Sequence, residues 1–530
     1  LATQVTWELR YPRNVGGSLD AIPACTPLPD SIALPVWSAA MDSLIPSVHQ
    51  RPSTRCESYL YEGSIMAYDL IIANGTVLHA HGHEKTDVAI RGEQIAAVAP
   101  GLAQSADGAK VLDATGKYVM PGGVDVHVHL ELPFCGTVSS DDWLTGTRAA
   151  ARGGVTTVID FAIPYGEQSL DDAYHAWLER AKPKACIDYA FHMAITNWDR
   201  HGPEMEKMVR KGCPTFKEFM IYASEGWQAD DRAIYNTLER ARELGAMLLV
   251  HAESSRVLDE LIARHHNPEE MKKLGARLHA ITRPNFIEAE AIQRAIMWAE
   301  VTKGRLYIVH MSTGEGTDIV RAARKRGVNV YAETCVQYLV LDDSVFAGPD
   351  GHLFACCPQV KKPKDQERLW QGLDDDDVSV ISTDTCTFNR GQKARWEGDW
   401  TKIPMGLPGL ETLLPLVYTH GVLAKRFTLS QFVAKCSTNP AKIMGLYPRK
   451  GVLAAGSDAD VVVIDPAKKM TVDFATMETG ADWNPYQGWS LAGFAEHTFS
   501  RGRQVVANYR CIGEMGWGKW LPREKAGALT

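Results

Sequence analysis

The feature that most constrains the fold is a regular alternation, through the middle of the chain, of short apolar runs with amphipathic helical patterns. The apolar runs are rich in β-branched and aromatic residues, which is typical of buried strands. Eight of them occur, at 119–130, 156–161, 186–193, 215–220, 247–251, 306–310, 328–332 and 378–384. In one of the intervening segments Ile234, Leu238 and Ala241 recur at helical spacing. That pattern stops at Gly245, a residue type that commonly ends helices.

Two fold classes accommodate eight strand–helix units. A (β/α)8 TIM barrel uses eight parallel strands, each followed by a helix, and tolerates insertions in its loops. A doubly wound open sheet is the alternative, but no glycine-rich dinucleotide turn follows the first run. We therefore predict an α/β fold built on a TIM barrel. Since 530 residues exceed what one hydrophobic core usually serves, we also expect further domains.

Short strand patterns separated by turns flank this centre on both sides. They occur before it at 68–75, 87–92, 94–99 and 110–116, and return after it at 459–465 and 498–506. Two β-rich flanks around a long centre indicate one discontinuous domain. We expect a β-sandwich formed by 66–118 and 448–511, a catalytic barrel at 119–447 and a C-terminal tail at 512–530.

Residues 1–65 differ from everything after them. They are rich in Pro, Ser and Thr, show no sustained period and lack the basic-then-apolar order of a secretory signal. The chain begins with Leu1, whereas Met66 directly precedes a clear strand pattern. We expect residues 1–65 to be an irregular N-terminal extension, such as a translated leader, that need not be part of the fold.

Composition excludes several classes of partner. Apolar residues make up 45% and charged residues 23%, as in ordinary globular proteins. The net charge of −8 argues against a broad nucleic-acid surface, and no apolar stretch is long enough to span a bilayer. None of the eleven cysteines forms a C-x-x-C pair, so reduced thiols in a cytoplasm are the simpler interpretation. We expect a cytoplasmic protein that acts on a small molecule, without nucleic acid or membrane.

Metal-ligand side chains stand at the ends of the predicted strands. His127 and His129 are two apart on the first run, so both side chains point to the same face. His251, His310 and Asp384 end the fifth, sixth and eighth runs. Functional side chains of a barrel gather at these ends. An isolated H-x-H pair is a weak signal, but four imidazoles and a carboxylate exceed what one tetrahedral zinc ion uses, so the set predicts two ions.

Lys217 is a charged residue in the fourth run, 215–220, which is otherwise largely apolar. A desolvated lysine loses its proton more easily, and a neutral amine can add carbon dioxide to become a carbamate, a bidentate anion. Such an anion could bridge two cations. The alternative is a lysine that extends to solvent or forms a salt bridge.

Six motifs in this order resemble the D-hydantoinase/dihydropyrimidinase branch of the amidohydrolase superfamily, over nearly everything from Tyr68 to about Arg510. They are PGGVDVHVH at 121–129, FKEFMIY at 216–222, VHAE at 250–253, VHMS at 309–312, STDTC at 382–386 and STNPAK at 437–442. The resemblance implies two zinc ions, or other divalent metals. It further implies that His127, His129 and Asp384 hold one metal. His251 and His310 would hold the other, and carboxylated Lys217 would bridge them.

The resemblance also implies a reaction. A hydroxide held between the metals exists at neutral pH and attacks the carbonyl of a cyclic amide, opening hydantoins, dihydropyrimidines or cyclic imides to N-carbamoyl amino acids or amic acids. Asp384 is expected to act as general base and then general acid. Tyr222 is expected to hydrogen-bond the developing oxyanion. Without the motif, Tyr222 would be interpreted as a packing residue.

Departures from the family pattern concern the pocket. The family usually has Asp-His-Cys where Thr385 follows Asp384, Cys-Ser-Pro-Pro where Cys357 stands, and Ile-Pro-Asn-Gly where Met405 stands. The resemblance implies that Cys357 and Met405 hold the ring amide largely through backbone atoms. These departures weaken a dihydropyrimidinase assignment more than a general cyclic-amidase one.

An apolar wall is expected after the first and fourth strands, where it would meet the substituent of the ring. Its candidate residues are Leu132, Phe134, Phe219 and Trp227. Residues of these types are more often plain core, which is the alternative interpretation.

Two other functions compete with a hydantoinase-like cyclic amidase. One is an allantoinase or another amidohydrolase acting on a cyclic ureide. The other is a non-catalytic scaffold like the dihydropyrimidinase-related neuronal proteins, which typically lack part of the ligand set that is complete here. The resemblance further implies a homotetramer or homodimer, with Trp517 and Trp520 of the C-terminal tail as a candidate contact.

Overall fold

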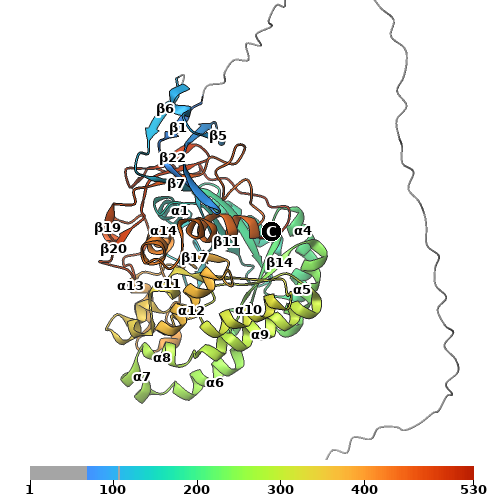
Figure 1. The fold of residues 1–530 in the computed structure, drawn as a ribbon. Helices are drawn as coiled ribbons and strands as arrows, with labels where there is room; N and C mark the ends of the chain where they lie inside the picture. The colour runs from blue at the N-terminus through green and yellow to red at the C-terminus, as the bar shows by residue number, and fades with distance from the viewer. Residues whose placement is uncertain (1–67, 106–107, 530) are drawn as a thin grey trace, which may run out of the picture. The chain divides into compact units, whose positions relative to one another are not determined.

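The structure is a computed structural model and describes residues 68–105 and 108–529. The expectation about residues 1–65 lies outside these described residues. Within them, two β-sheets stand beside a strand-and-helix barrel (Figure 1).

The central sheet has eight parallel strands that follow one another around a ring in chain order. They are β8 (Gly123–Val128), β11 (Val155–Ala162), β12 (Asp188–Ala194), β13 (Thr215–Phe219), β14 (Met247–His251), β15 (Leu306–Ile308), β16 (Val330–Cys335) and β17 (Val380–Ser382). A bridge between Val128 and Thr385 closes the ring. Helices cover the outside, so nearly every strand residue is buried, which explains the continuous apolar runs in the sequence. The predicted TIM barrel is confirmed.

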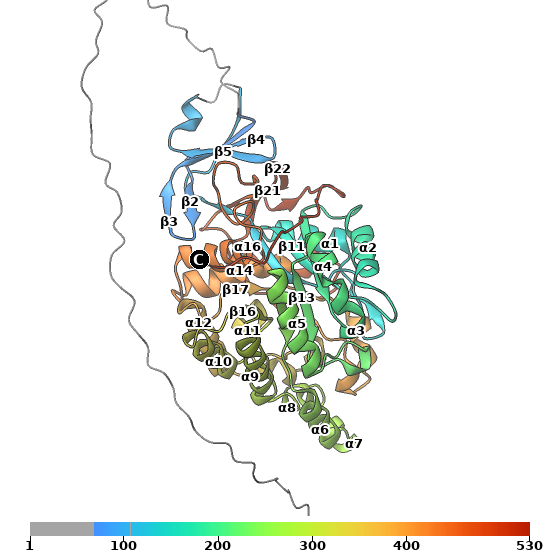
Figure 2. The ribbon, with the colours of Figure 1, turned by 90° about the vertical axis from the view of Figure 1, so that its right-hand side faces the viewer.

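The helix predicted around Ile234 and Leu238 begins and ends as its sequence indicates. In α5 (Asp231–Leu244) the side chain of Asp230 accepts a hydrogen bond from the backbone N–H of Ala233, and Gly245 closes the helix in the left-handed region. The other covering helices include α1 (Trp143–Arg152), α2 (Leu170–Ala181), α4 (Met205–Arg210), α9 (Asn285–Thr302), α10 (Gly314–Lys325) and α12 (Pro363–Asp374). Three further helices, inserted between β14 and α9, extend the end of the barrel at which the strands terminate (Figure 2): α6 (Ser255–His265), α7 (Pro268–Leu274) and α8 (Arg277–Ile281).

Both flanks of the chain contribute strands to a shared sheet, as predicted. In that seven-stranded sheet β7 (Tyr118–Pro121) pairs with β18 (Val461–Ile464). Its other strands are β2 (Thr76–His79), β3 (Gly82–Lys85), β21 (Ala495–Ser500), β22 (Arg503–Ala507) and β23 (Arg510–Cys511). A four-stranded sheet packs on it and contains β1 (Leu70–Ala73), β4 (Asp87–Arg91), β5 (Gln94–Ala99) and β6 (Lys110–Asp113). Apolar side chains from both sheets, among them Ile90 and Val461, form the core between them.

The first predicted run differs from expectation because it serves two sheets. Its start is β7 of the sandwich and its end is β8 of the barrel, with Gly122 between them. A Cβ atom at Gly122 would lie 2.0 Å from Oγ1 of Thr156, so the close approach of β11 requires glycine at this joint.

The C-terminal tail packs on the barrel of its own chain. Trp520 forms a bridge with Tyr189 of β12, and its ring lies 5.5 Å from that of Tyr174. The guanidinium of Arg501 lies 4.2 Å from the ring centre of Trp517. Both tryptophans therefore already have partners within the chain.

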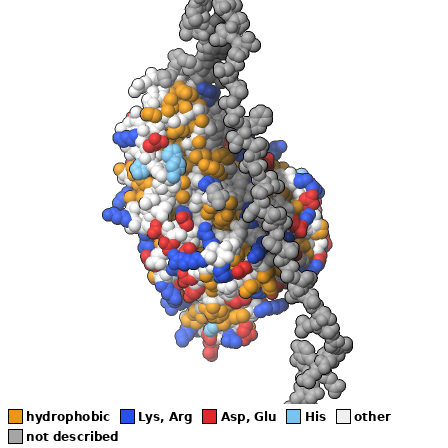
Figure 3. Space-filling model, turned by 45° about the vertical axis from the view of Figure 1, so that its right-hand side comes forward, with side chains coloured by type: hydrophobic (Ala, Val, Ile, Leu, Met, Phe, Trp, Pro, Cys, Tyr) orange, Lys and Arg blue, Asp and Glu red, His pale blue; other side chains and the backbone are white. Residues whose placement is uncertain are grey.

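The surface carries both signs of charge. On the face drawn in Figure 3, Lys and Arg side chains are interspersed with Asp and Glu. Among the described residues, no helix has both the length and the apolar character that crossing a bilayer requires.

Candidate metal centre

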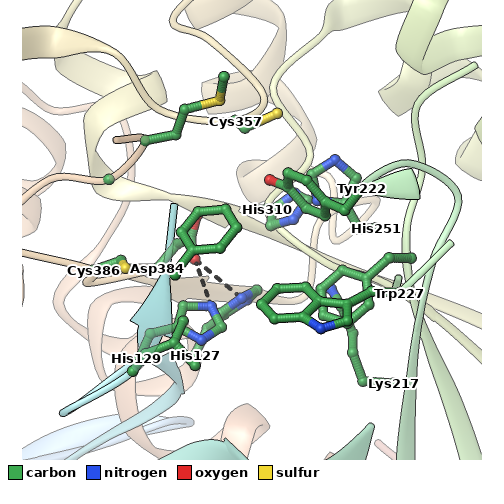
Figure 4. A pocket seen from close by; sticks show the side chains of 15 residues that line it. His127, His129, Lys217, Tyr222, Trp227, His251, His310, Cys357, Asp384 and Cys386 are labelled. Atoms are coloured by element: carbon green, nitrogen blue, oxygen red, sulfur yellow. Dashed lines mark ion pairs between the residues drawn. The ribbon is translucent and has the colours of Figure 1, made fainter. Parts of the chain in front are cut away.

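The site residues predicted from the sequence surround one pocket at the carboxyl ends of the barrel strands (Figure 4). All thirteen line it: His127, His129, Leu132, Phe134, Lys217, Phe219, Tyr222, Trp227, His251, His310, Cys357, Asp384 and Met405. Cys386 and Gly406 complete the lining. The barrel thus brings together residues that are up to 278 positions apart in sequence, from His127 to Met405.

Three of the candidate ligands, His129, His310 and Asp384, lie just beyond their strands rather than on them. The sequence predicted strands ending at His310 and Asp384, whereas β15 ends at Ile308 and β17 at Ser382. The backbone turns into the left-handed region at His310 (φ 38°) and Asp384 (φ 51°), which ends the strand ladder. Strained conformations of this kind persist where the surroundings determine them, and they are common at functional sites.

Asp384 lies between the two histidines of the first strand. Its Oδ1 is 3.1 Å from Nε2 of His127 and 3.2 Å from Nε2 of His129, the two contacts drawn as dashed lines in Figure 4. Burial acts to raise the pKa of Asp384, but His127 and His129 lower it more, to well below its ordinary value. The carboxylate is therefore ionised at neutral pH and available to a cation.

The other two histidines face the same centre. The rings of His251 and His310 lie 4.5 Å apart, and those of His127 and His310 lie 5.2 Å apart. Nδ1 of His129 and Nδ1 of His310 are buried and have no hydrogen-bond partner among the described residues. Buried polar atoms are rarely left without a partner, so these imidazoles fit a site for divalent cations.

Lys217 is enclosed within the barrel, with 1% of its surface exposed. Its Nζ lies over the rings of Phe161 and Phe219, at 5.3 and 4.9 Å from their centres. Burial lowers its pKa to about 7, against the opposing effect of Asp384. An exposed amine or a salt bridge was the alternative interpretation, but the amine is buried and no ion pair of Lys217 occurs among the described residues. A substantial neutral fraction of the amine can therefore exist at physiological pH.

Tyr222 follows β13 and has a left-handed backbone (φ 71°). Its ring lies 5.2 Å from that of His251, and Figure 4 shows its hydroxyl on the side of the pocket near Cys357. Burial, together with Cys357, raises the pKa of the phenol well above its ordinary value. Tyr222 therefore keeps its proton and can donate a hydrogen bond into the pocket.

The apolar wall is an aromatic cluster. The ring of Phe134 stacks on that of Trp227 at 5.4 Å, and the rings of Phe219 and Trp227 are 5.3 Å apart. Leu132 is buried beside them. These side chains leave an apolar surface next to the histidines, suited to a hydrocarbon or aromatic group.

Sequence reasoning missed two buried carboxylates that hydrogen-bond the imidazoles. Glu253 accepts from Nε2 of His251 at 2.8 Å, and Glu333 is hydrogen-bonded to Nδ1 of His127. The available signal for Glu253 was its place in the VHAE motif at 250–253, two residues after His251. The available signal for Glu333 was an acidic residue directly after an apolar run.

Barrels with histidine, lysine and aspartate ligands at the carboxyl ends of their strands define a class of metal-dependent hydrolases. A family model described as the amidohydrolase family matches residues 118–505. The chain therefore belongs to the amidohydrolase family.

Known proteins with similar sequences and structures cover most of the chain. The chain is 39% identical to D-hydantoinase of Geobacillus stearothermophilus, over 87% of this chain and 97% of that protein. It is 37% identical to D-phenylhydantoinase of Escherichia coli, over 86% of this chain and 98% of that protein. The crystal structure of dihydropyrimidinase from Brevibacillus agri matches with a TM-score of 0.84 at 39% identity, covering 87% of this chain and 99% of that one.

Proposed function

We propose that this protein is a metal-dependent hydrolase that opens cyclic amide rings, such as those of hydantoins, dihydropyrimidines and cyclic imides. The products would be N-carbamoyl amino acids or amic acids. The observation that carries the proposal is the convergence of four histidines, Asp384 and Lys217 on one pocket, in a chain that resembles D-hydantoinases along most of its length.

Two zinc ions are the proposed cofactors, with His127, His129 and Asp384 holding one and His251 and His310 the other. Carboxylation of buried Lys217 would provide a bridging ligand to both. When bound, such cations lower the pKa of water, so that hydroxide is available at neutral pH. Cysteines that are free and mostly buried, including Cys357 in the pocket, favour a reducing compartment such as the cytoplasm.

Asp384 and Tyr222 supply the proton transfer and the hydrogen bond that the proposed reaction needs. Asp384, ionised at neutral pH, accepts a proton at Oδ as water adds to the ring carbonyl, and returns it to the ring nitrogen that leaves. Tyr222 donates its hydroxyl proton in a hydrogen bond to the carbonyl oxygen, where negative charge develops. Both groups line the pocket, so no large rearrangement is needed.

The rest of the pocket binds and orients the substrate. The backbone at Cys357 and Met405 would hold the ring amide. Leu132, Phe134 and Phe219 would contact the group attached to the ring, so substrates with an aromatic or alkyl substituent are favoured.

The test is a ring-opening panel on zinc-loaded protein: hydantoin, 5-phenylhydantoin, dihydrouracil, allantoin and a cyclic imide, with metal content measured on the same sample. Fastest turnover of 5-phenylhydantoin is expected. Preferential turnover of allantoin would favour the cyclic-ureide alternative. Protein that retains no metal when purified without chelator, and opens no ring after loading, would favour the non-catalytic scaffold.

The proposal extends to the assembly and the domains. A homotetramer or homodimer is proposed, and light scattering coupled to size exclusion measures the mass of the assembly.

We also propose that the chain divides into a sandwich from 66–118 and 448–511, a barrel at 119–447 and a tail at 512–530.

A further inference from the structure

Two buried carboxylates that the proposed reaction does not use stand behind the imidazoles of the candidate metal centre. Glu333 belongs to β16, and Glu253 follows β14 by two residues. Both are completely buried. A buried carboxylate is costly unless other groups compensate its charge, so the partners of each one indicate what it does.

The partners of Glu333 are His127, His310 and Tyr307. Its Oε1 accepts hydrogen bonds from Nδ1 of His127 and, at 3.1 Å, from the backbone N–H of His310. Its Oε2 accepts from the hydroxyl of Tyr307 at 2.8 Å. Because Glu333 occupies Nδ1 of His127, Nε2 is the nitrogen left to face Asp384, 3.1 Å away.

The partners of Glu253 are on the side of His251. Its Oε2 accepts from Nε2 of His251 at 2.8 Å and from the thiol of Cys357 at 2.9 Å. The guanidinium of Arg283 lies 3.8 Å from its other oxygen, Oε1. Nδ1 of His251 is therefore the nitrogen left to bind a cation.

His251, Glu253 and Cys357 could themselves be interpreted as a cation site, since their ligand atoms lie within 4.8 Å of one another. The surroundings argue against it. The positive charge of Arg283 already balances Glu253, and Nε2 of His251 is used in the hydrogen bond to Glu253. Burial and the neighbouring Glu253 also raise the pKa of the Cys357 thiol, so it stays protonated and donates. The three side chains form a hydrogen-bonded chain from the metal centre to the pocket wall.

Other hydrogen bonds hold the backbone of the loop that carries Cys357. The backbone carbonyl of Cys356 accepts from Nε2 of His279 at 2.8 Å, and that of Ala355 accepts from Nζ of Lys393 at 2.9 Å. These bonds anchor the backbone of the loop. The thiol of Cys357 adds a direct connection between this loop and the carboxylate that supports His251.

We propose that Glu333 and Glu253 are positioning residues, one for each half of the metal centre, and that Glu253 also fixes the substrate-facing wall through Cys357. The proposal rests on the proposed function for the identity of the two halves. Carboxylates behind metal-binding imidazoles set the ring orientation and make the imidazole a stronger ligand. Each half thus has one carboxylate bonded to an imidazole. Glu333 also accepts from the backbone N–H of His310, in the other half, and only Glu253 is linked to substrate contact, through Cys357.

The first experiment measures metal retention and needs no substrate. Zinc-loaded wild-type protein, Glu333→Gln, Glu253→Gln and the double variant are dialysed against increasing chelator concentrations, and zinc per chain is determined. Glutamine keeps the shape but removes the charge. Each single variant is expected to release one zinc at a roughly 10- to 100-fold lower free chelator concentration than wild type. The double variant is expected to release both zinc ions at such lower concentrations.

Glu218→Gln is the matched control, because Glu218 is a buried glutamate of β13 that bonds Thr237 at 2.7 Å rather than an imidazole. It is expected to retain both ions like wild type. Melting curves of the metal-free proteins separate lost metal affinity from unfolding. If a glutamine variant does not fold, the shorter Glu→Asp change at the same position is measured and is expected to release one zinc early as well.

The second experiment tests the wall and compares Cys357→Ser, which keeps a donor, with Cys357→Ala, which does not. The KM of Cys357→Ala for ring opening is expected to exceed that of Cys357→Ser about tenfold, as for loss of one hydrogen bond to a charged group, with equal zinc content.

Equal KM values would overturn the role of Cys357, and unchanged zinc retention in both glutamine variants would overturn the positioning roles. Predicted zinc loss in a protein that opens no ring would instead contradict the proposed function and leave the positioning of metal intact.

Discussion

Asp384 and His127 meet where the barrel closes, with Oδ1 of the aspartate 3.1 Å from Nε2 of the histidine. The bridge that joins the last strand to the first pairs Val128 with Thr385, the residues directly after each of them. The backbone N–H of His129 donates to the carbonyl of Thr385 at 2.8 Å in the same seam. Closing the barrel and assembling this half of the candidate metal centre are therefore one structural event.

Replacing Asp384 by Asn keeps the shape of this contact but removes the charge that accepts a proton. We expect kcat to fall by about 10²- to 10⁴-fold, the usual contribution of a general acid–base group. Metal content is measured on the same sample, and kcat is expressed per metal-loaded chain. A loaded variant with wild-type kcat would contradict the proton-transfer role.

Removing the hydroxyl of Tyr222 tests the oxyanion contact. Tyr222→Phe keeps the ring that packs near His251, at 5.2 Å, and so should keep the pocket and its metals. We expect kcat to fall about 10²- to 10³-fold with a smaller change in KM, since the bond strengthens as charge develops on the substrate. The control is Tyr235→Phe, which removes a tyrosine hydroxyl on α5 that donates a hydrogen bond to Glu239. A kcat loss shared by both variants would point to a general effect on the fold.

Lys217→Ala should remove metal and activity together, because the proposed carbamate bridges both ions. We expect the affinity for zinc to fall by at least about 100-fold, the upper range for residues that only support metal ligands. Lys435→Ala removes another buried lysine, paired with Asp376 away from the pocket, and should keep both ions. Mass spectrometry of the intact protein at neutral pH should also find carbon dioxide on Lys217. An active, zinc-loaded Lys217→Ala protein would exclude the bridging role.

The barrel and its candidate ligands could be predicted because each has a local signal. Strands buried on both faces leave unbroken apolar runs, and a histidine at the end of such a run is visible without knowing its neighbours. The hydrogen bond between His127 and Glu333 has no such signal, because it joins residues 206 positions apart and depends on how the strands are placed around the ring. The left-handed backbone at His310 and Asp384 also escaped prediction, since side-chain pattern does not specify it. Tertiary packing determines both.

The buried carboxyl of Glu218 gives a prediction for stability against pH. Burial raises its pKa from an ordinary 4.5 to about 8, although Thr237 donates a hydrogen bond to it. Between these values the unfolded chain loses this proton while the folded protein keeps it, so stability falls as pH rises. Glu218→Gln has no such proton. Relative to wild type, its free energy of unfolding should therefore rise from pH 5 to pH 8, by at most about 4 kcal/mol.

Thermal melting of metal-free protein at several pH values measures the effect of Glu218→Gln. The control is Glu243→Gln on α5, where an exposed glutamate bonds Arg240 at 2.9 Å. Its melting temperature should follow that of wild type across the range, because an exposed carboxylate keeps its hydration in the folded state. If the Glu218→Gln curve also follows wild type, the buried carboxyl is ionised in the fold. Water or a shifted side chain must then compensate its charge, and Glu218 would cost the fold little at neutral pH.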